Sequence, residues 1–487
     1  MQKASPPTPP PESGRDTIEA DICILGAGPA GIALAIAAAG YGQTVMLVEK
    51  HKMGGTSLNY GAVPAVALAA VAARAHAFRS AKPFGIQPIE PAVDRSAVAA
   101  HIREIIDANA PNASAERLTG LGVRVISAAA RFTDPRTVVA GQHKIVARRF
   151  VVATGSAPLI SEISGLDRVP YLTTDTIYSC REPIDHLIVV GGGASGLEIA
   201  QAQRRLGARV SVVEKNSVLS RFDPELGAVV RERLIAEGVV IVEGTLARAA
   251  ESGSGRIRLD VTAGEAHSQI EGSHLLIACG RRPGIADLGL KEAKIVTGAD
   301  GIKVNACLRT SNRRVYAIGD VTGLPHSTQR AQYQAGLLAR TLLFRQSARN
   351  EPHLIPATIH TDPEFASVGL SEAEARAKTS SIQVLRWPVR ENTRALALRA
   401  PEGHIKIIAD KSGRILGAAI VALGASELIE VWALAVARSL VIEDMAGWVA
   451  PYPSMGELSR AASANRSAAA TGHALSRRWV KFLAKFG

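Results

Sequence analysis

Two glycine motifs, each followed by an acidic residue, carry the clearest chemical signal in the sequence. In the first, Gly26, Gly28 and Gly31 belong to "GAGPAG", and Glu49 follows in "VMLVEK". Such glycines let the backbone turn tightly and approach a pyrophosphate, and the helix behind them supplies free N–H groups and partial positive charge. A carboxylate at Glu49 can accept hydrogen bonds from a ribose diol. The spacing therefore predicts a dinucleotide site.

The same arrangement occurs a second time along the chain. Gly191, Gly193 and Gly196 belong to "GGGASG", and Glu214 follows in "VSVVEK". One GxGxxG motif is weak evidence, but two, each between a predicted strand and a predicted helix, are strong. A carboxylate at Glu214 would repel a 2′-phosphate, so the second site favours NADH. The adjacent Lys215 leaves NADPH as an alternative.

The elements around these motifs predict the fold class. "ADICILGAGPAGIALAIAAAG" and "HLIVVGGGASGLEIAQAQRRLG" each read as a buried parallel strand, a glycine turn and a helix. From about Pro356 the pattern changes to strands with hairpin-type turns followed by helices, as in an α+β unit. We expect an α/β protein with two doubly wound Rossmann-like domains and a C-terminal α+β domain.

Composition narrows the class of protein. The chain has 487 residues, of which 47% are apolar, enough for several domains of a globular enzyme. We see no run of about twenty apolar residues and no signal-peptide core, so we expect a cytoplasmic protein. The four cysteines have neither CxxC nor His-paired spacing, and we expect reduced packing residues and no metal site.

The formal net charge of +12 suggests an anionic partner. The basic residues are spread along the chain without an aromatic-interleaved patch, so we expect no nucleic-acid partner. An anionic cofactor, an acidic partner or a membrane surface fits better.

A series of motifs then points to a family. "GAGPAG", "GGTSLNYGAVP", "VVATGSAP", "GGGASG", "ACGRRPG", "VYAIGDVTG", "TDPEFASVGLSEAE" and "YPSMGE" occur in this order. The chain from about Asp21 to Ala470 thus resembles the pyridine nucleotide-disulfide oxidoreductases, which include dihydrolipoamide dehydrogenase, glutathione reductase and mercuric reductase. "IAQAQRRLG" and "YQAG" favour the mercuric-reductase-like branch.

The resemblance implies FAD in the first unit, NADH or NADPH in the second, and a homodimer formed by the last domain. It places Asp320 on the ribitol of the flavin and Gln329 near the flavin pyrimidine. The implied domains are a disordered tail (1–17), an FAD domain in two parts (18–157 and 283–352), an NAD(P) domain (158–282), a dimerisation domain (353–475) and a basic tail (476–487).

The residues expected to bind the two cofactors form one set. They are Gly26, Gly28, Pro29, Ala30, Gly31, Glu49, Lys50, Gly55, Thr56, Ser57, Ala130, Ala153, Thr154, Gly155, Gly191, Gly193, Ala194, Ser195, Gly196, Glu214, Lys215, Gly280, Arg281, Gly319, Asp320 and Gln329.

The stretch "GGTSLNYGAVPAVAL" departs from the family. Members with a redox disulfide read "GGTCLNVGCIPSK", so their cysteines fall on Ser57 and Ala62, and the lysine beside flavin N5 falls on Val66. A hydroxyl has no accessible disulfide state and alanine has no redox chemistry, so dithiol exchange is excluded here. Cys23, Cys180, Cys279 and Cys307 are not expected to replace the missing pair.

A second departure lies near the C-terminus. Disulfide members carry a His and a Glu in "HPTLSE", and this chain has Tyr452 and Glu457 in "YPSMGE". Tyrosine is a poor base near pH 7 but a good donor to a developing oxyanion, as on a quinone carbonyl. The alternative is that Tyr452 only packs at the dimer interface.

The remaining candidate is Glu198, which the resemblance places near flavin N5. Burial beside Val66 without a positive partner would raise its pKa, although a purely structural Glu198 is an alternative. The candidate catalytic residues are thus Glu198, Tyr452, Glu457 and Ser57.

The last residues, "SRRWVKFLAKFG", predict a short basic amphipathic helix. Trp479, Phe482, Leu483 and Phe486 share one face, while Arg478, Lys481 and Lys485 lie opposite. Such a helix could lie on an anionic membrane at the inner face; the alternatives are that it packs on the dimer or is a solvated tail.

Three functions fit the sequence. We favour a homodimeric FAD enzyme that takes hydride from NADH and passes electrons directly to a small acceptor such as a quinone. The alternatives are transhydrogenation between NADH and NADP⁺, and a flavoprotein kept as a binding or scaffold subunit.

Overall fold

The first parallel sheet forms around the apolar run that precedes the first glycine motif. The computed structural model describes residues 16–253, 255–379, 381–470 and 474–486. Strand β1 (Asp16–Leu25) leads through the glycine turn into helix α1 (Pro29–Gly40), and β2 (Val45–Glu49) returns parallel to β1. The sheet has the order β3-β2-β1-β6-β5-β4, with β19 also pairing with β6. The predicted strand, turn and helix are therefore confirmed.

The other main elements of this first unit come from two separated parts of the chain. They are α2 (Gly55–Asn59), α3 (Ala62–Arg79), α4 (Arg95–Asn109), α5 (Ala115–Gly120), β3 (Val123–Ser127), β4 (Ala130–Asp134), β5 (Thr137–Ala140), β6 (His143–Val152), β7 (Ser156–Pro158), β16 (Arg281–Pro283), β17 (Thr297–Gly298), β18 (Gly301–Ile302), β19 (Val315–Ala317) and α8 (Thr328–Phe344).

The second unit repeats this plan around the second glycine motif. Strand β9 (His186–Val190), helix α6 (Ala194–Arg205) and strand β10 (Arg209–Val213) form its core. The parallel sheet has the order β11-β10-β9-β15-β8, and an antiparallel three-stranded sheet, β12-β13-β14, is attached to it. Its other elements are β8 (Tyr171–Thr173), α7 (Pro224–Ala236), β11 (Val239–Val242), β12 (Leu246–Gly253), β13 (Arg256–Ala263), β14 (Ala266–Gly272) and β15 (His274–Ile277).

The third unit is an antiparallel sheet covered by helices, as the change of pattern near Pro356 predicts. The sheet has the order β20-β21-β24-β23-β22, and its core includes the fully buried Trp432, whose Nε1 donates to Ser459 Oγ at 2.9 Å. Its elements are β20 (Ala357–Ile359), β21 (Glu364–Gly369), α9 (Glu372–Lys378), β22 (Ile382–Pro388), α10 (Thr393–Ala397), β23 (His404–Asp410), β24 (Ile415–Ala422), α11 (Ala425–Ala437), α12 (Ile442–Ala446) and α13 (Glu457–Ala470).

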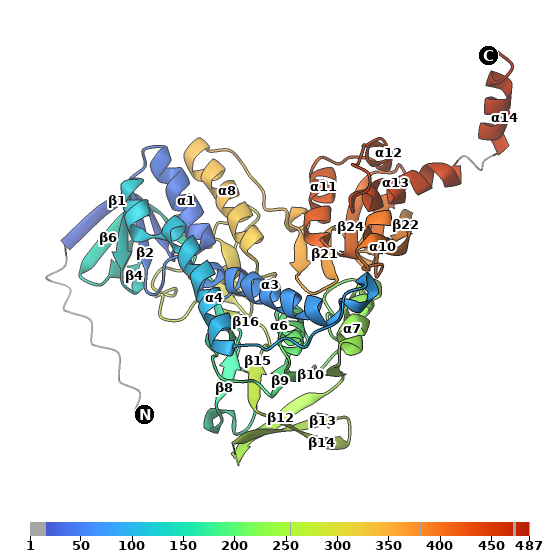
Figure 1. Ribbon diagram of the computed structural model, residues 1–487. Helices are drawn as coiled ribbons and strands as arrows, with labels where there is room; N and C mark the ends of the chain where they lie inside the picture. Colours follow the sequence, from blue (N-terminus) through green and yellow to red (C-terminus); the bar gives the residue numbers. More distant parts are fainter. Residues whose placement is uncertain (1–15, 254, 380, 471–473, 487) are drawn as a thin grey trace.

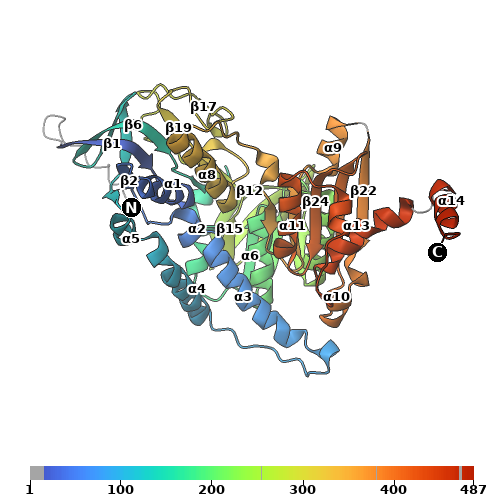
Figure 2. The same cartoon turned by 90° about the horizontal axis from the view of Figure 1, so that it is seen from above.

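The three units meet in the middle of the molecule. Figure 1 shows the first unit on the left, the third on the right and the second below them, with α3 running across the centre. In Figure 2 α3 and α6 lie side by side, and they belong to one buried apolar cluster that includes Leu68, Ala72 and Leu197. The glycine turns of both parallel sheets therefore face a common interior.

One segment passes a length and composition test for a membrane span, in contrast to the sequence expectation. Residues Gly55–Arg79 have a mean hydropathy of 1.4, and only 28% of the most apolar window is buried. The segment is nevertheless broken at Gly61 between α2 and α3, and Leu68 and Ala72 pack into the core cluster. Its high hydropathy comes from its many alanines, so we regard it as a packed helix of the enzyme.

The two predicted tails have different outcomes. Residues 1–15 of the N-terminal tail lie outside the described residues, whereas Asp16 and Thr17, which were predicted to belong to the tail, begin β1 and pair with β6. At the other end, α14 (Ala474–Leu483) forms as predicted and lies apart from the rest of the molecule in Figure 1.

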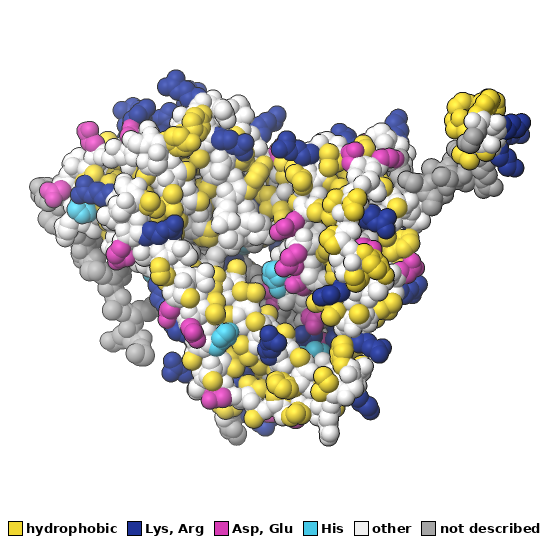
Figure 3. Space-filling view, turned by 45° about the horizontal axis from the view of Figure 1, so that its top comes forward, with side chains coloured by type: hydrophobic (Ala, Val, Ile, Leu, Met, Phe, Trp, Pro, Cys, Tyr) yellow, Lys and Arg dark blue, Asp and Glu magenta, His cyan; other side chains and the backbone are white. Residues whose placement is uncertain are grey.

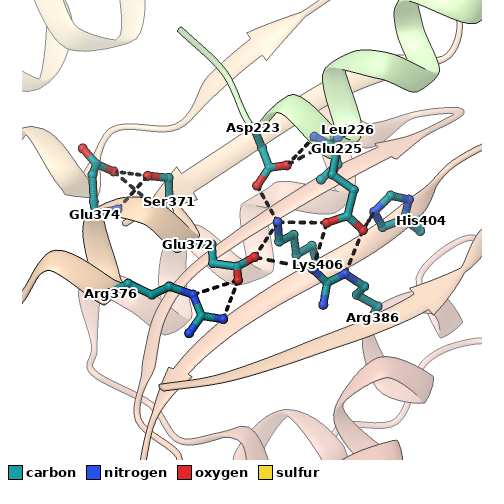
Figure 4. A network of polar contacts seen from close by, with 10 residues as sticks. All are labelled: Asp223, Glu225, Leu226, Ser371, Glu372, Glu374, Arg376, Arg386, His404 and Lys406. Atoms are coloured by element: carbon teal, nitrogen blue, oxygen red, sulfur yellow. Dashed lines mark hydrogen bonds and ion pairs between the residues drawn. The ribbon is translucent and has the colours of Figure 1, made fainter. Parts of the chain in front are cut away.

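A buried lysine joins the second unit to the third. Lys406 on β23 is 4% exposed, and its Nζ lies 2.8 Å from Asp223, 3.0 Å from Glu225 and 2.8 Å from Glu372 (Figure 4). Asp223 and Glu225 lie at the start of α7, so the ion pairs of Lys406 link this helix to the antiparallel sheet. Burial lowers the pKa of Lys406, but the three carboxylates outweigh it and raise that pKa.

We expect Lys406→Met to destabilise the protein by about 3–5 kcal/mol, because it leaves the buried carboxylate of Asp223 without its cation. Thermal unfolding of the purified holoenzyme measures this as a lower Tm. Lys411→Met, at an exposed site after the same strand, is the control and should change stability by less than about 0.5 kcal/mol. Equal Tm values for the two variants would contradict the role of the ion network.

Candidate active site

The first glycine turn is built by close backbone contacts that only glycine allows. Gly26 has a φ of +106°, and a Cβ there would lie 2.4 Å from the carbonyl oxygen of Ala153. A Cβ on Gly31 would lie 2.0 Å from the carbonyl oxygen of Gly26, so α1 packs directly on the turn. Gly28 differs, since a Cβ there would meet nothing within 4 Å. The N-terminus of α1 therefore opens onto free space.

The second glycine turn repeats this geometry closely. Gly191 has a φ of +115°, and a Cβ there would lie 2.4 Å from the carbonyl oxygen of Ala278. A Cβ on Gly196 would lie 2.1 Å from the carbonyl oxygen of Gly191, whereas one on Gly193 would meet nothing within 4 Å. Both turns thus offer an unobstructed helix N-terminus, which suits an anionic phosphate group.

The acidic residue of each unit is held beside its glycine turn. Glu49 accepts hydrogen bonds from the backbone N–H of Ala27 at 2.7 Å and of His51 at 2.8 Å. Glu214 accepts equivalent bonds from Gly192 at 2.7 Å and Asn216 at 2.9 Å. Because a carboxylate has about four acceptor positions, each can still accept hydrogen bonds from a ribose diol.

One cavity of about 2440 Å³ connects the two turns. Drug-sized ligands usually occupy about 300–1,000 Å³, so this volume suits two dinucleotides better than one. Of the residues that the sequence predicts to bind cofactors, all except Gly31 and Gly196 line this cavity. Those two glycines instead pack each helix against its own turn.

Arg281 fastens the two nucleotide-binding units together at the cavity wall. Its guanidinium donates to Ser156 Oγ at 2.9 Å, to Asp175 Oδ1 at 2.7 Å and to Thr56 Oγ1 at 3.3 Å. Ser156 Oγ in turn donates to Asp320 Oδ2 at 2.6 Å. Arg281 therefore orders the wall around Asp320 through protein contacts.

The stretch after Gly54 enters the cavity without sulfur. Gly55 has a φ of +58°, and a Cβ there would lie 2.8 Å from the Cα of Gly28, so this stretch touches the first glycine turn. Ser57 and Ala62 both line the cavity, and Ser57 Oγ shares a 2.5 Å hydrogen bond with Thr328 Oγ1. The two positions to which the family resemblance assigns the cysteine pair thus hold a hydroxyl and a methyl group.

Val66 differs from its predicted place. It is 54% exposed and does not line the cavity, because it lies on the outer side of α3, whereas Ala62 and Ala65 on the same helix face inward. The predicted rise in the pKa of Glu198 therefore does not come from packing against Val66.

Glu198 has a different environment from the one predicted. It lines the cavity, and burial raises the pKa of its carboxyl group, as expected. It does not lack a partner, since Oε1 accepts the backbone N–H of His360 at 2.7 Å, a contact that opposes the rise. The partner comes from β20 and its following turn, about 160 residues away in sequence, which the sequence alone could not reveal.

The four cysteines are distant in sequence from Ser57 and Ala62, and their environments differ from that of a redox pair. All four are free, Cys23 is fully buried, and burial raises its pKa to about 12. Cys279 does line the cavity, which we did not expect, but its Sγ donates to Val190 O beside the second glycine turn. Burial also raises the pKa of Cys279.

Tyr452 and Glu457 lie outside the cavity of their own chain, unlike the other two candidate catalytic residues, Ser57 and Glu198. Tyr452 is 73% exposed, and neither residue lines the cavity. Gln329 does line it, with its Nε2 donating to Pro356 O at 3.0 Å.

Several polar residues in the cavity wall were missed by sequence reasoning. Ser156 lies within the motif "VVATGSAP" but was not assigned a role, and the others carry no assigned motif position, so only their juxtaposition in the cavity reveals them: Ser156, Asp175, Tyr178, His326, Thr328 and His360.

Comparison with known proteins agrees with this geometry. The family model described as pyridine nucleotide-disulphide oxidoreductase matches residues 20–335, and that of its dimerisation domain matches residues 355–462. A mercuric reductase from Streptomyces lividans is 34% identical over 91% of this chain and 95% of its own. A dihydrolipoyl dehydrogenase from Geobacillus stearothermophilus is 30% identical over 92% of this chain and 97% of its own.

Solved structures show the same architecture. LpdA from Mycobacterium tuberculosis superposes with a TM-score of 0.84 at 28% identity, covering 92% of this chain and 99% of its own. The flavoprotein disulfide reductase RclA from Escherichia coli gives a TM-score of 0.81 at 23% identity, over 92% of this chain and 99% of its own, which supports the fold alone. Members of the family use FAD and NAD(P)H, and the dimerisation domain supports a homodimer. From its two glycine turns to its antiparallel C-terminal sheet, the chain belongs to the pyridine nucleotide-disulphide oxidoreductase family.

Proposed function

We propose that this flavin-dependent pyridine nucleotide oxidoreductase passes electrons directly to a diffusible acceptor of the quinone class, without a disulfide relay. The observation that carries the proposal is the pair Ser57 and Ala62 in the cavity wall, where the family motif has its cysteines. Neither side chain can accept and release two electrons. Electrons that enter the cavity must therefore leave to an external molecule.

The residues of this chain have defined tasks in that reaction. Bound FAD would supply the hydride-accepting ring and NADH the hydride. The N-termini of α1 and α6, with Glu49 and Glu214, would bind the two nucleotides, and Arg281 keeps the wall between them ordered through Ser156 and Asp175. We assign a positioning role to Glu198, which lines the cavity and whose carboxylate accepts the backbone N–H of His360 and so fixes the backbone there.

The preference for NADH over NADPH rests on Glu214. Two backbone N–H groups hold its carboxylate beside the turn, so it cannot swing away from a 2′-phosphate without losing both bonds. Lys215 also lines the cavity and keeps NADPH as the weaker donor.

Tyr452 and Glu457 would serve the partner subunit's cavity in the homodimer. The exposed Tyr452 is free to reach across an interface, where its hydroxyl would donate a hydrogen bond to the acceptor oxygen. This assignment is the part of the proposal that depends on the dimer.

We further propose that α14 brings this cytoplasmic enzyme to an anionic membrane, where lipid-soluble quinones reside. Trp479, Phe482 and Phe486 are 61%, 47% and 74% exposed, and Trp479 stacks on Phe482 at 5.6 Å. Figure 3 shows a cluster of apolar side chains on one side of the terminal helix and basic ones on the other. An apolar face backed by cations suits the surface of an anionic bilayer.

Anaerobic stopped-flow absorbance tests the main proposal. NADH should reduce the bound flavin, a water-soluble quinone should reoxidise it, and lipoamide should not. Reoxidation by NADP⁺ but not by quinone would overturn the proposal in favour of transhydrogenation. Absence of flavin reduction would instead indicate a scaffold subunit.

A matched pair of glycine variants tests the two nucleotide sites. Gly28→Val should abolish FAD retention, whereas Gly193→Val should keep FAD but weaken NADH binding about tenfold or more, because each side chain fills space meant for a phosphate. FAD content by absorbance and NADH titration measure these effects. Gly336→Val, at another glycine whose Cβ would meet nothing within 4 Å, is the control. Loss of FAD from both Gly28 and Gly193 variants alike would contradict separate sites.

Vesicle co-sedimentation tests the terminal helix. The full chain should bind vesicles containing phosphatidylglycerol and not phosphatidylcholine alone, and Phe482→Glu should weaken binding about tenfold or more. Val240→Glu, at an exposed position of β11, is the control. Equal binding by wild type and Phe482→Glu would show that the helix does not contact lipid, and a change in oligomeric state would assign it to the partner subunit.

A further inference from the structure

His360 is a titratable side chain in the cavity that neither the family motifs nor the assignments above use. It follows β20 directly and lines the cavity together with Thr358 and Glu198. Its side chain lines the cavity and is 45% exposed, so water reaches it. Such a position suits a group that delivers a proton and is then reloaded from water.

The imidazole lies between side chains of the two strands that flank it, β20 and β21. Nδ1 lies 4.0 Å from Glu364 Oε1, and Nε2 lies 3.5 Å from Thr358 Oγ1. Glu364 is itself fixed, because its Oε2 accepts hydrogen bonds from the backbone N–H and Oγ of Ser426 at 2.9 and 2.7 Å. One carboxylate oxygen is thus anchored and the other faces the imidazole.

The backbone of the same residue is fastened to the second glycine unit. Its N–H donates to Glu198 Oε1 at 2.7 Å, and Glu198 lies in the second turn of α6, directly behind the second phosphate site. His360 is therefore positioned by α6 on one side and by β21 on the other. A movement of either element would displace it from the cavity.

The charged side chains that affect the pKa of His360 are all acidic, and they come from three different elements. Glu364 comes from β21, Glu198 from α6 and Glu427 from the first turn of α11. The neighbouring carboxylate of Glu364 raises the pKa of His360 most, burial lowers it, and Glu198 and Glu427 raise it further. The net rise keeps the imidazole protonated to a higher pH than a free histidine.

We propose that His360 is the proton donor to the acceptor oxygen in this cavity. The inference rests on the proposed function, since a quinone that gains two electrons must also gain two protons. The hydride equivalent carries two electrons and one proton to the quinone, and the Nδ1–H or Nε2–H bond of His360 breaks as the second quinone oxygen forms its O–H bond. Neutral His360 then recovers a proton from water at its exposed edge.

Rapid-reaction kinetics with two kinds of acceptor test this role. In His360→Gln, reoxidation of the reduced flavin by a quinone at pH 7 should slow by about 100-fold, the lower range for general acid catalysis. Reoxidation by ferricyanide, which takes electrons without protons, and flavin reduction by NADH should stay within about twofold. His353→Gln, at an exposed histidine outside the cavity, is the control.

A direct titration gives a readout that does not depend on turnover. Carbon-13 NMR of labelled histidine should place the pKa of His360 above about 6.5, its ordinary value. Glu364→Gln should lower that pKa and shift the falling limb of the quinone-reoxidation profile to lower pH, because a raised pKa extends the protonated form upward in pH.

The outcomes separate the two proposals. If quinone does not reoxidise the wild-type protein, the proposed function fails and His360 has no acceptor to serve. If quinone reoxidises wild type and His360→Gln at equal rates, the proton donor is another group and only this inference fails. Equal slowing with quinone and ferricyanide would show a structural effect of the substitution and would also overturn it.

Discussion

The close contact of backbone with backbone at the glycine turns is the constraint on which the rest of this structure depends. A helix can point its N-terminus at a phosphate only if no side chain stands between the helix, the strand end and the ligand. Gly31 and Gly196 remove that side chain on the helix, since a Cβ on either would lie about 2 Å from a carbonyl oxygen. Gly55 does the same for the stretch that carries Ser57.

The two units built on this constraint and the third, antiparallel unit have to keep a fixed relation, because all three contribute residues to the cavity wall. Arg281 joins the nucleotide-binding units through Ser156, Asp175 and Thr56, and Lys406 joins the second unit to the third through Asp223 and Glu225. Both cations pair with groups from other units, so each is stable only in the assembled arrangement. Domain geometry and site geometry are therefore maintained by the same ion pairs.

The chemistry that we propose for the cavity follows from the side chains of Ser57 and Ala62, which stand where the family motif has its two cysteines. A serine that hydrogen-bonds Thr328 and an alanine leave positions 57 and 62 of the wall without a redox group, while Glu198 and His360 are among the ionisable groups that line the same cavity. An external acceptor fits such a site, because the wall then needs only to orient the acceptor and supply protons. The acids around His360 make the imidazole a better proton carrier near neutral pH than a free histidine would be.

The sequence by itself determined the two nucleotide units, the α+β domain and the glycines of the two turns, because turns, helix starts and strand ends are local and leave local patterns. It also determined the loss of the cysteines, which is a matter of residue identity at Ser57 and Ala62. Only the tertiary structure decided that Val66 faces outward, that Glu198 has a partner in His360, and that Tyr452 stands outside its own chain's cavity. These depend on helix rotation and on contacts between residues more than a hundred positions apart, and no local pattern of residue types encodes such distances.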